Sequence, residues 1–474
     1  MAIRIYNTLT RKKEEFKPIS EGVVKIYNCG PTVYDYFHIG NARNFVVFDV
    51  IRRYLEYKGF KVIFVQNITD IDDKIINRAK EEGKTWKEVA DKYTEEYFKD
   101  ADSLGIRRAD FHPKATEHIK EMIELIEKLI SSGLAYELDG NVYFEVNKFP
   151  EYGRLSGQKV DELLAGTRID INEKKKSPID FSLWKKSKPD EPSWDSPWGP
   201  GRPGWHIECS VMSMKYLSSN FDIHGGGIDL VFPHHENEIA QSDGAVGSRV
   251  VNCWIYNGHL NISGEKMSKS IGNILLAKDI LKKYNRQAIR LFLLFAHYRS
   301  PLDYNQSNIE NDERGYSEIY NKYFSLMEII NASEKKSGVS SEVYNIKELV
   351  DKQKEKFILS LDDDFNTAQA LGSLFELING IKYIIAKEDV QFFKKLVLEE
   401  LEYAKDTVLL LCSILGIEPT NINIDEGIRK LIKERDEARK IKNWERADSI
   451  RNLLAEKGII LEDTPSGVIA IKKH

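Results

Sequence analysis

The 474-residue sequence has few cysteines, no long apolar run and no excess of positive charge. Its four cysteines, at positions 29, 209, 253 and 412, are too few and too scattered for a disulfide framework, so burial or metal binding must account for them. No apolar stretch approaches the roughly 20 residues that cross a bilayer. The first residues also lack the apolar block of a secretory signal. We therefore expect a cytoplasmic protein that does not enter a membrane.

Charge and composition set the broad class. The formal net charge of -5 argues against a surface that binds nucleic acid everywhere, although local basic patches remain compatible with it. A hydrophobic fraction of 42% and a charged fraction of 30% are those of an ordinary globular protein, and the length allows several domains.

A strand, a tight turn and a helix start follow one another near the N-terminus. The apolar, β-favouring run 23–27 leads into Cys29-Gly30-Pro31, and His38-Ile39-Gly40-Asn41 then opens an apolar helical pattern over 45–54. Residues 61–68 read as a second buried strand. The sequence therefore predicts a βαβ unit and a parallel sheet.

The helix start at His38 has the chemistry of a nucleotide site. Gly40 lets the backbone approach a base or ribose closely, the helix N-terminus attracts negative charge, and His38 offers a ring donor where phosphate charge develops. The alternative interpretation is a chance match, since one H-x-G motif is short.

A second short motif, KMSKS at 266–270, places Lys266 and Lys269 three residues apart in a loop of small residues. Loop lysines of this kind can close over a triphosphate and stabilise charge on the leaving group. A solvated charged loop is the alternative interpretation. HIGN and KMSKS in this order resemble the two signatures of class I aminoacyl-tRNA synthetases.

Acidic residues follow the second strand. Thr69 and Asp70 stand at its carboxyl end, where ligands gather in open α/β sheets, so either could face a substrate. Asp72 and Asp73 are better interpreted as capping the next helix.

A mixed metal site is the sharpest chemical hypothesis. In a helix started by Pro233, His234 and Glu238 lie one turn apart on the same face. Together with distant thiolates from Cys29 and Cys209 they would make a tetrahedral zinc site of sulfur, nitrogen and oxygen donors. Spacing alone also allows the adjacent His235 and Glu236 as ligands, and isolated cysteines are more often core residues.

Together the motifs resemble those of the cysteinyl-tRNA synthetases: Cys29 just before HIGN, GWHIECS at 204–210, HGGGIDLVFPHHENE at 224–238, and KMSKS. The segment SPIDFSLWK at 177–185 is similar to that family's insertion. The resemblance implies activation of L-cysteine with ATP to cysteinyl-adenylate, then transfer to tRNA(Cys) by a monomer with one zinc ion, and with magnesium accompanying ATP. The zinc ligands implied are Cys29, Cys209, His234 and Glu238.

The resemblance also assigns the other site residues. It implies catalytic roles for His38, Lys266 and Lys269, and substrate contacts from Cys29, Gly30, Thr69 and Trp205. Whether Trp205 walls the pocket or is a buried structural residue stays open. The ATP-binding residues implied are His38, Gly40, Asn41, Gly225, Gly226, Gly227, Asp229, Lys266 and Lys269.

Zinc would suit an enzyme that selects cysteine. Serine differs from cysteine by one chalcogen atom, which a hydrophobic pocket rejects only weakly. A thiolate-rich zinc instead favours the substrate sulfur over a harder hydroxyl, so coordination supplies the discrimination. Binding of the substrate sulfur requires either five-coordination or a loosened Glu238, and the sequence does not decide between them.

The expected architecture is a Rossmann-like α/β domain with an insertion, then a helical bundle and a small C-terminal α+β domain. Cys253 and Cys412 lie in apolar runs and are expected in the core. The acidic run 362–364 is interpreted as helix capping rather than a cation site. The boundaries are 1–110 and 201–308 for the two catalytic halves, 111–200 for the insertion, 309–416 for the bundle and 425–474 for an anticodon-binding domain.

The C-terminal end is rich in both signs of charge. Trp444 could stack on a base beside a dense set of basic residues, but interleaved acids fit a solvated helix equally well, and only the resemblance favours tRNA contact. The basic residues are Arg429, Lys430, Lys433, Arg435, Arg439, Lys440 and Lys442.

Two other functions share part of this pattern. A cysteine-activating ligase could have the same zinc and nucleotide motifs yet pass cysteine to a small amine, but the long helical region and basic end argue against it. A non-catalytic zinc protein that binds nucleic acid would leave HIGN and KMSKS unexplained.

Overall fold

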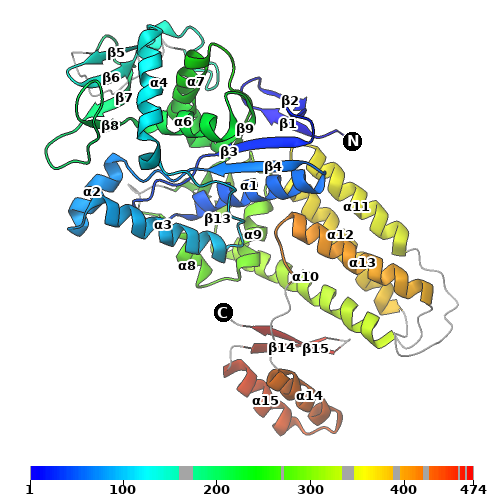
Figure 1. The fold of residues 1–474 in the computed structure, drawn as a ribbon. Helices are drawn as coiled ribbons and strands as arrows, with labels where there is room; N and C mark the ends of the chain where they lie inside the picture. The colour runs from blue at the N-terminus through cyan, green and yellow to red at the C-terminus, as the bar shows by residue number, and fades with distance from the viewer. Residues whose placement is uncertain are drawn as a thin grey trace. The chain divides into compact units, whose positions relative to one another are not determined.

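The computed structural model describes residues 2–159, 175–267, 272–333, 346–387, 395–419, 426–456, 459–464 and 467–472 (Figure 1). The chain divides into two compact units. The first unit comprises Met1–Lys278, Ala296–Tyr304 and Leu361–Asn366, and the second comprises Asp279–Phe295, Asn305–Ser360 and Thr367–His474.

A four-stranded parallel sheet forms the centre of the first unit. Its strands are β3 (Val23–Asn28), β4 (Lys61–Gln66), β9 (Phe221–Gly227) and β10 (Val251–Asn257), in the order β10-β9-β3-β4. The strands are largely buried, which explains why β3 and β4 read as mainly apolar runs. The predicted βαβ unit and parallel sheet are confirmed.

Helices cover this sheet. Helix α1 (Ile39–Tyr57) connects β3 to β4, while α6 (Trp205–Leu217) precedes β9 and α7 (Glu236–Val246) connects β9 to β10 (Figure 1). Helix α1 contacts β4, β9 and β10, and α6 contacts β3 and β4. The apolar stripe of α1 is buried over most of its length, which fixes its N-terminus at the edge where the strands end.

The strand order creates a switch point. The chain leaves β3 to form β4 on one side, and β9 later pairs with β3 on the other side. Connections therefore diverge at the carboxyl ends of β3 and β9, and ligands of open α/β sheets bind in the crevice formed there.

The inserted part of the first unit contains an antiparallel sheet of β5 (Ala135–Leu138), β6 (Asn141–Phe144), β7 (Phe181–Lys186) and β8 (Gly201–Pro203). Asp139 and Gly140 join β5 to β6 with φ of 56° and 83°, the conformation typical of a two-residue hairpin turn. Residues 160–174 of the expected insertion lie outside the described residues.

The remaining elements complete the two units. In the first unit they are β1 (Arg4–Asn7), β2 (Lys12–Glu15), α2 (Asp73–Glu82), α3 (Trp86–Ser103), α4 (Ile119–Ser131), β11 (Leu260–Ile262), β12 (Glu265–Lys266) and β13 (Leu302–Tyr304), and α8 (Ala277–Leu281) runs from the first unit into the second. The second also contains α9 (Arg286–Leu294), α10 (Gln306–Ser333), α11 (Ile346–Asp362, whose last residues belong to the first unit), α12 (Thr367–Lys387), α13 (Lys395–Ile414), α14 (Glu426–Lys440), α15 (Trp444–Glu456), β14 (Ile459–Thr464) and β15 (Gly467–Lys472).

The second unit is helical apart from its terminal hairpin. Helices α10, α12 and α13 contact one another, as the expected bundle requires, and β14 pairs with β15. Part of the expected linker, residues 420–425, lies outside the described residues. Cys253 and Cys412 are buried, as predicted. Over the described ranges, no helix combines the length and apolar character that crossing a bilayer requires.

The acidic run before α12 makes tertiary contacts, so its interpretation as helix capping was wrong. The Asp362 carboxylate accepts hydrogen bonds from the Tyr54 hydroxyl at 2.7 Å and from Lys58 at 2.9 Å. The buried Asp364 carboxylate pairs with Arg299 at 2.7 Å. These carboxylates thus fasten the segment between α11 and α12 to the first unit.

Candidate active site

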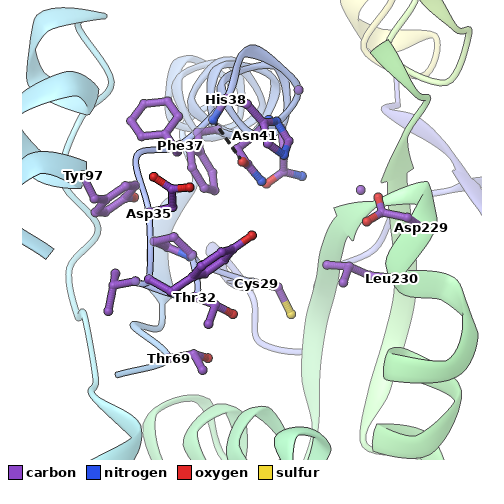
Figure 2. A pocket seen from close by; sticks show the side chains of 18 of the residues that line it. Cys29, Thr32, Asp35, Phe37, His38, Asn41, Thr69, Tyr97, Asp229 and Leu230 are labelled. Atoms are coloured by element: carbon purple, nitrogen blue, oxygen red, sulfur yellow. Dashed lines mark hydrogen bonds between the residues drawn. The ribbon is translucent and has the colours of Figure 1, made fainter. Parts of the chain in front are cut away.

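A cavity of about 710 Å³ opens at the carboxyl ends of β3 and β9, the switch point of the sheet. Figure 2 shows His38 and Asn41 at the start of α1, Asp229 and Leu230 on one side, and Asp35 and Tyr97 on the opposite side. Cys29 and Thr69 lie at a further end of the same cavity. The cavity therefore joins the two motifs that the sequence linked to nucleotide and metal binding.

The four sequence-predicted zinc ligands meet at one edge of the cavity. The Sγ atom of Cys29 is 3.8 Å from Sγ of Cys209, 3.8 Å from Nε2 of His234 and 3.9 Å from Oε1 of Glu238. Nε2 of His234 is 2.9 Å from Oε1 of Glu238. All four side chains are buried.

These distances fit a tetrahedral zinc. Zinc–ligand bond lengths imply edges of roughly 3.8 Å between two sulfurs, about 3.6 Å between sulfur and nitrogen, and about 3.3 Å between nitrogen and oxygen. The three edges from Sγ of Cys29 are 3.8, 3.8 and 3.9 Å, close to these lengths, whereas the His234–Glu238 edge of 2.9 Å must open slightly. The donor set therefore accommodates the metal with little rearrangement.

The electrostatics of the cluster also call for a cation. Burial raises the pKa of the Cys29 thiol and the pKa of the Glu238 carboxyl well above their ordinary values. A hydrogen bond from the Cys29 thiol lowers the pKa of Cys209 to about 7, against the effect of burial. Several acids buried together are unfavourable as anions unless positive charge is supplied, and a divalent ion supplies it.

The ligands come from three segments of the chain. Cys29 directly follows β3, where its N–H donates to the carbonyl of Gly225 at 3.0 Å, and Cys209 lies on α6. The helix holding Glu238 begins at Glu236 and not at Pro233 as expected, because a wider turn over Val231–His235 precedes it. His234 and Glu238 nevertheless face one another.

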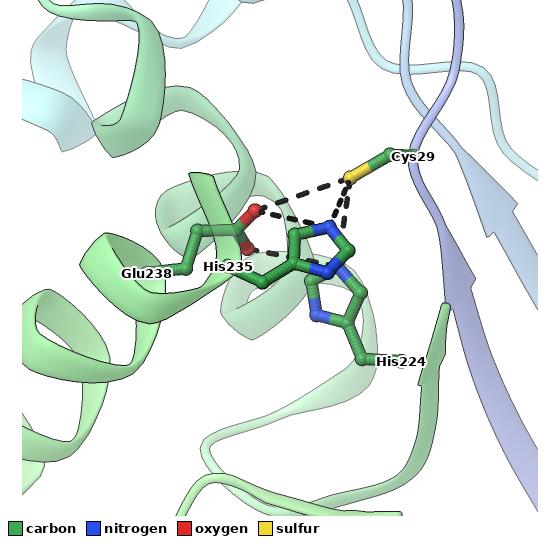
Figure 3. A group of neighbouring side chains, drawn as sticks. All are labelled: Cys29, His224, His235 and Glu238. Atoms are coloured by element: carbon green, nitrogen blue, oxygen red, sulfur yellow. Dashed lines mark hydrogen bonds and ion pairs between the residues drawn. The ribbon is translucent and has the colours of Figure 1, made fainter. Parts of the chain in front are cut away.

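A second set of donors overlaps the first (Figure 3). It shares Cys29 and Glu238 but adds His224 and His235, whose Nε2 atoms are 3.6 and 3.1 Å from Sγ of Cys29. The competitor Glu236 is excluded, because its carboxylate accepts from the backbone of residues 155 and 156. Sequence reasoning did not consider His224 as a ligand, although its place in HGGG at the end of β9 is the signal that marks it.

Neighbouring side chains orient the histidines. Nδ1 of His206 is 2.9 Å from Nδ1 of His234, which leaves Nε2 of His234 directed at the cluster. The Trp205 ring stacks on His234 at 4.2 Å and lines the cavity, and it is only partly buried, which favours the pocket-wall interpretation. Nδ1 of His235 is held by the Tyr256 hydroxyl at 2.8 Å.

His38 and Asn41 form a capping box at the start of α1. The backbone N–H of Asn41 donates to Nδ1 of His38 at 3.2 Å, and the Asn41 side chain accepts from the N–H of His38 at 3.4 Å. An imidazole that accepts at Nδ1 carries its proton on Nε2. The cap therefore makes His38 the ring donor that the sequence predicted, at a helix N-terminus that favours phosphate.

The glycines of the site are required for different reasons. Gly40 and Gly227 line the cavity, whereas Gly225 and Gly226 are not among the described lining residues. A Cβ on Gly225 would meet the Phe48 ring at 1.9 Å, so packing explains it. A Cβ on Gly30 would lie 1.7 Å from a backbone carbonyl oxygen, so only glycine fits beside Cys29.

The lysine motif is described in part. Lys266 ends β12, Met267 lines the cavity beside Gly40, and Lys269 lies outside the described residues. Asp229, the expected ribose acceptor, is exposed at the cavity wall.

Thr69 belongs to a buried polar network under the cavity. Its hydroxyl donates to Oε2 of Glu208 at 3.0 Å and accepts from Asn67 at 3.2 Å. Burial raises the pKa of Glu208. Sequence reasoning missed Glu208, whose only signal is its position next to Cys209. Asp70 is turned away, since it accepts from the Thr116 hydroxyl at 2.6 Å.

The two aspartates that follow have separate roles. Asp72 caps α2 as predicted, by accepting from the N–H of Lys74 at 2.9 Å. Asp73 pairs instead with Lys185 at 2.8 Å and with Arg202. One lysine of the basic insertion is therefore already engaged within the chain.

Comparisons with known proteins agree with this geometry. Residues 15–314 match the family described as the tRNA synthetases class I (C) catalytic domain, and residues 356–417 match the DALR domain. A curated cysteine–tRNA ligase from Thermodesulfovibrio yellowstonii is 52% identical, over 98% of this chain and 99% of its own.

Two solved structures are similar in fold. Methionyl-tRNA synthetase of Mycobacterium tuberculosis, in complex with methionyl-adenylate, aligns with a TM-score of 0.62 at 15% identity, over 86% of this chain and 94% of that one. The LeuRS of Agrobacterium radiobacter K84, in a ternary complex with tRNA and LeuAMS, aligns with a TM-score of 0.59 at 10% identity, over 97% of both chains.

Proposed function

The chain belongs to the cysteine–tRNA ligase family of class I tRNA synthetases, and from that premise we propose that it activates L-cysteine with ATP and transfers the cysteinyl group to the 3′ end of tRNA(Cys). One observation carries this proposal. The buried donors Cys29, Cys209, His234 and Glu238 converge at the same cavity as the His38 helix start. A thiol-selecting metal and a nucleotide site thus share one reaction space.

The metal end of the cavity would select the amino acid. Cys29, Cys209, His234 and Glu238 would hold a zinc ion, which would supply a Lewis acid that favours the sulfur of cysteine over the hydroxyl of serine. Trp205 keeps the ligand His234 in place by stacking on its ring. The Thr69 hydroxyl donates to Glu208 and accepts from Asn67, and its second lone pair would accept from the amino group of the substrate.

The nucleotide end would position ATP for in-line attack by the cysteine carboxylate. His38 donates through Nε2 to the triphosphate, Asp229 accepts from ribose hydroxyls, and Gly40 with Gly227 admits the close approach of the nucleotide. Magnesium accompanies ATP and binds chiefly phosphate oxygens. No side-chain nucleophile is needed, so catalysis rests on position and charge stabilisation.

Two assays test this function. Cysteine-dependent exchange of pyrophosphate into ATP separates an enzyme from a non-catalytic zinc protein. Transfer of labelled cysteine to a tRNA(Cys) transcript separates a synthetase from a ligase that uses a small amine. We expect both activities with cysteine and little with serine; exchange without transfer to tRNA would refute the synthetase assignment.

Lys269 is proposed to stabilise the leaving pyrophosphate. The Lys269→Ala variant should slow cysteine-dependent exchange about 100-fold, the usual effect of losing one charge-stabilising donor. The affinity for cysteine should hardly change, because Lys269 is proposed to act on the pyrophosphate of ATP and not on the amino acid. Lys282→Ala, which removes an exposed lysine beyond α8, is the control. Equal exchange rates for the two variants would show that Lys269 does not stabilise the leaving pyrophosphate.

The terminal region, residues 425–474, is proposed to bind the anticodon. Trp444 is 56% exposed and Ile441 is 76% exposed at the turn between α14 and α15, which offers an aromatic face to an unpaired base. Of the basic residues near it, Lys430, Lys433 and Lys442 are exposed, while Arg435 is buried.

The Trp444→Ala variant tests this assignment. Loss of one stacked base costs about 1–3 kcal/mol, so kcat/KM for tRNA should fall roughly 5- to 160-fold, with exchange unchanged. Trp444→Phe keeps an aromatic ring and should retain most of the activity. Normal tRNA kinetics in the alanine variant would show that no base stacks there.

We also propose the domain boundaries, the oligomeric state and the location of the protein. The segments 1–110 and 201–308 form the catalytic domain, 111–200 the insertion and 309–416 the bundle. We infer a monomer in the cytoplasm, where the four free cysteines stay reduced. Light scattering of the purified chain, with and without tRNA, measures the oligomeric state.

A further inference from the structure

Three tyrosines on one wall of the cavity are not explained by the zinc donors or the nucleotide motifs. Tyr34 and Tyr36 precede α1, and Tyr93 comes from α3; all three line the cavity. Tyr36 and Tyr93 meet edge to face, with ring centroids 5.3 Å apart and planes at 90°. Tyr34 and Tyr36 keep part of their surface exposed, whereas Tyr93 is buried behind them. We call this group the tyrosine wall.

Two lysines lie over the rings of the tyrosine wall. Nζ of Lys74 is 5.4 Å from the centroid of Tyr34, and Nζ of Lys278 lies over the ring of Tyr36. Lys74 is exposed and lines the cavity. The cations next to Tyr93 are less available, because Glu82 pairs with Arg78 and Lys92. The wall thus presents aromatic rings together with two ammonium groups.

The position of the wall suggests what it binds. In Figure 2, Asp35 and Tyr97 face Asp229 and Leu230 across the cavity, and Cys29 lies at another end. The proposed function places the nucleotide at Asp229 and the amino acid at Cys29. The side with Asp35, between Tyr34 and Tyr36 in the sequence, is left for the second substrate, which must reach the activated carbonyl in the same cavity.

We infer that the tyrosine wall binds the unpaired 3′-terminal nucleotides of tRNA, with a base stacked on the face of Tyr36 that Lys278 leaves free and backbone phosphates paired with Lys74 and Lys278. This inference rests on the proposed function. Aromatic side chains interleaved with cations are the common means of holding single-stranded RNA, because every base has a face for stacking and every linkage has a charge. The rival occupant is the triphosphate of ATP, which would use the lysines but not the rings.

The first test separates stacking from general structure. Tyr36→Leu should reduce single-turnover transfer from preformed cysteinyl-adenylate to tRNA roughly 5- to 100-fold, while Tyr36→Phe keeps the ring and should transfer normally. Binding gives a readout independent of activity: wild type should bind a full-length transcript more tightly than one lacking its three terminal nucleotides, and Tyr36→Leu should bind both equally. A retained preference in the leucine variant would overturn the inference.

The second test addresses the lysines. Lys74→Met should lower the salt dependence of tRNA binding by about one unit of slope on logarithmic axes. Lys80→Met, an exposed lysine farther along α2, is the matched control and should leave the slope unchanged. If exchange falls in parallel with transfer in Lys74→Met or Tyr36→Leu, the wall belongs to the ATP site. Absence of exchange in wild type would instead refute the proposed function itself.

Discussion

Replacing Cys209 with serine should remove the bound zinc and the preference for cysteine over serine together. Cys209 supplies one of two sulfur donors 3.8 Å apart, and a serine hydroxyl neither reaches the metal distance of a thiolate nor ionises as readily. We expect zinc affinity to fall by more than about 100-fold, beyond the usual effect of changing an outer-shell partner. Elemental analysis and exchange rates with each amino acid measure the two losses.

The same variant decides between the two overlapping donor sets. Cys209 belongs only to the set with His234, whereas His235 belongs only to the set with His224. If the first set holds the metal, His235→Gln should retain one zinc per chain. Cys253→Ser is the matched control, because Cys253 is also buried and free but lies outside both sets. Zinc retained in Cys209→Ser with unchanged selection would mean that the assigned centre is wrong.

Sequence patterns predicted the local structure around the candidate site. The run from 23 to 41 dictated a strand, a turn and a capped helix, because apolar periodicity and the His38 cap are local properties. The order of β3, α1 and β4 then required a parallel pair. The convergence of Cys29 with Cys209, however, is a long-range contact that local patterns cannot establish: donor chemistry made it a hypothesis, and the resemblance to a known family then favoured it.

The sequence could not predict the site where several side chains approach the same position. His234 and His235 both point into the core because a wider turn precedes α7, so helical spacing could not separate them. His224 faces the same sulfur from β9, and its direction depends on how the strand pairs. For the same reason the acidic run ending α11 was misread, since Asp362 and Asp364 find partners far away in the sequence.

Replacing His38 with asparagine should separate the two roles of this residue. Asparagine is among the best N-cap residues, so it should preserve the bond from the N–H of Asn41 and hence the start of α1. It lacks the ring N–H that we propose to meet the developing phosphate charge. Losing one such donor typically slows catalysis about 100- to 1,000-fold, so exchange should fall by that factor while the affinity for cysteine stays unchanged.

His38→Ala supplies the comparison, because it removes the cap as well as the ring. It should slow exchange at least as much as asparagine and also reduce the free energy of unfolding by about 1 kcal/mol, the usual cost of an N-cap. Chemical denaturation of the two variants measures that difference. Exchange at the wild-type rate in the asparagine variant would show that the helix N-terminus alone holds the triphosphate. A loss of exchange matched by an equal loss of stability in both variants would make His38 a structural residue only.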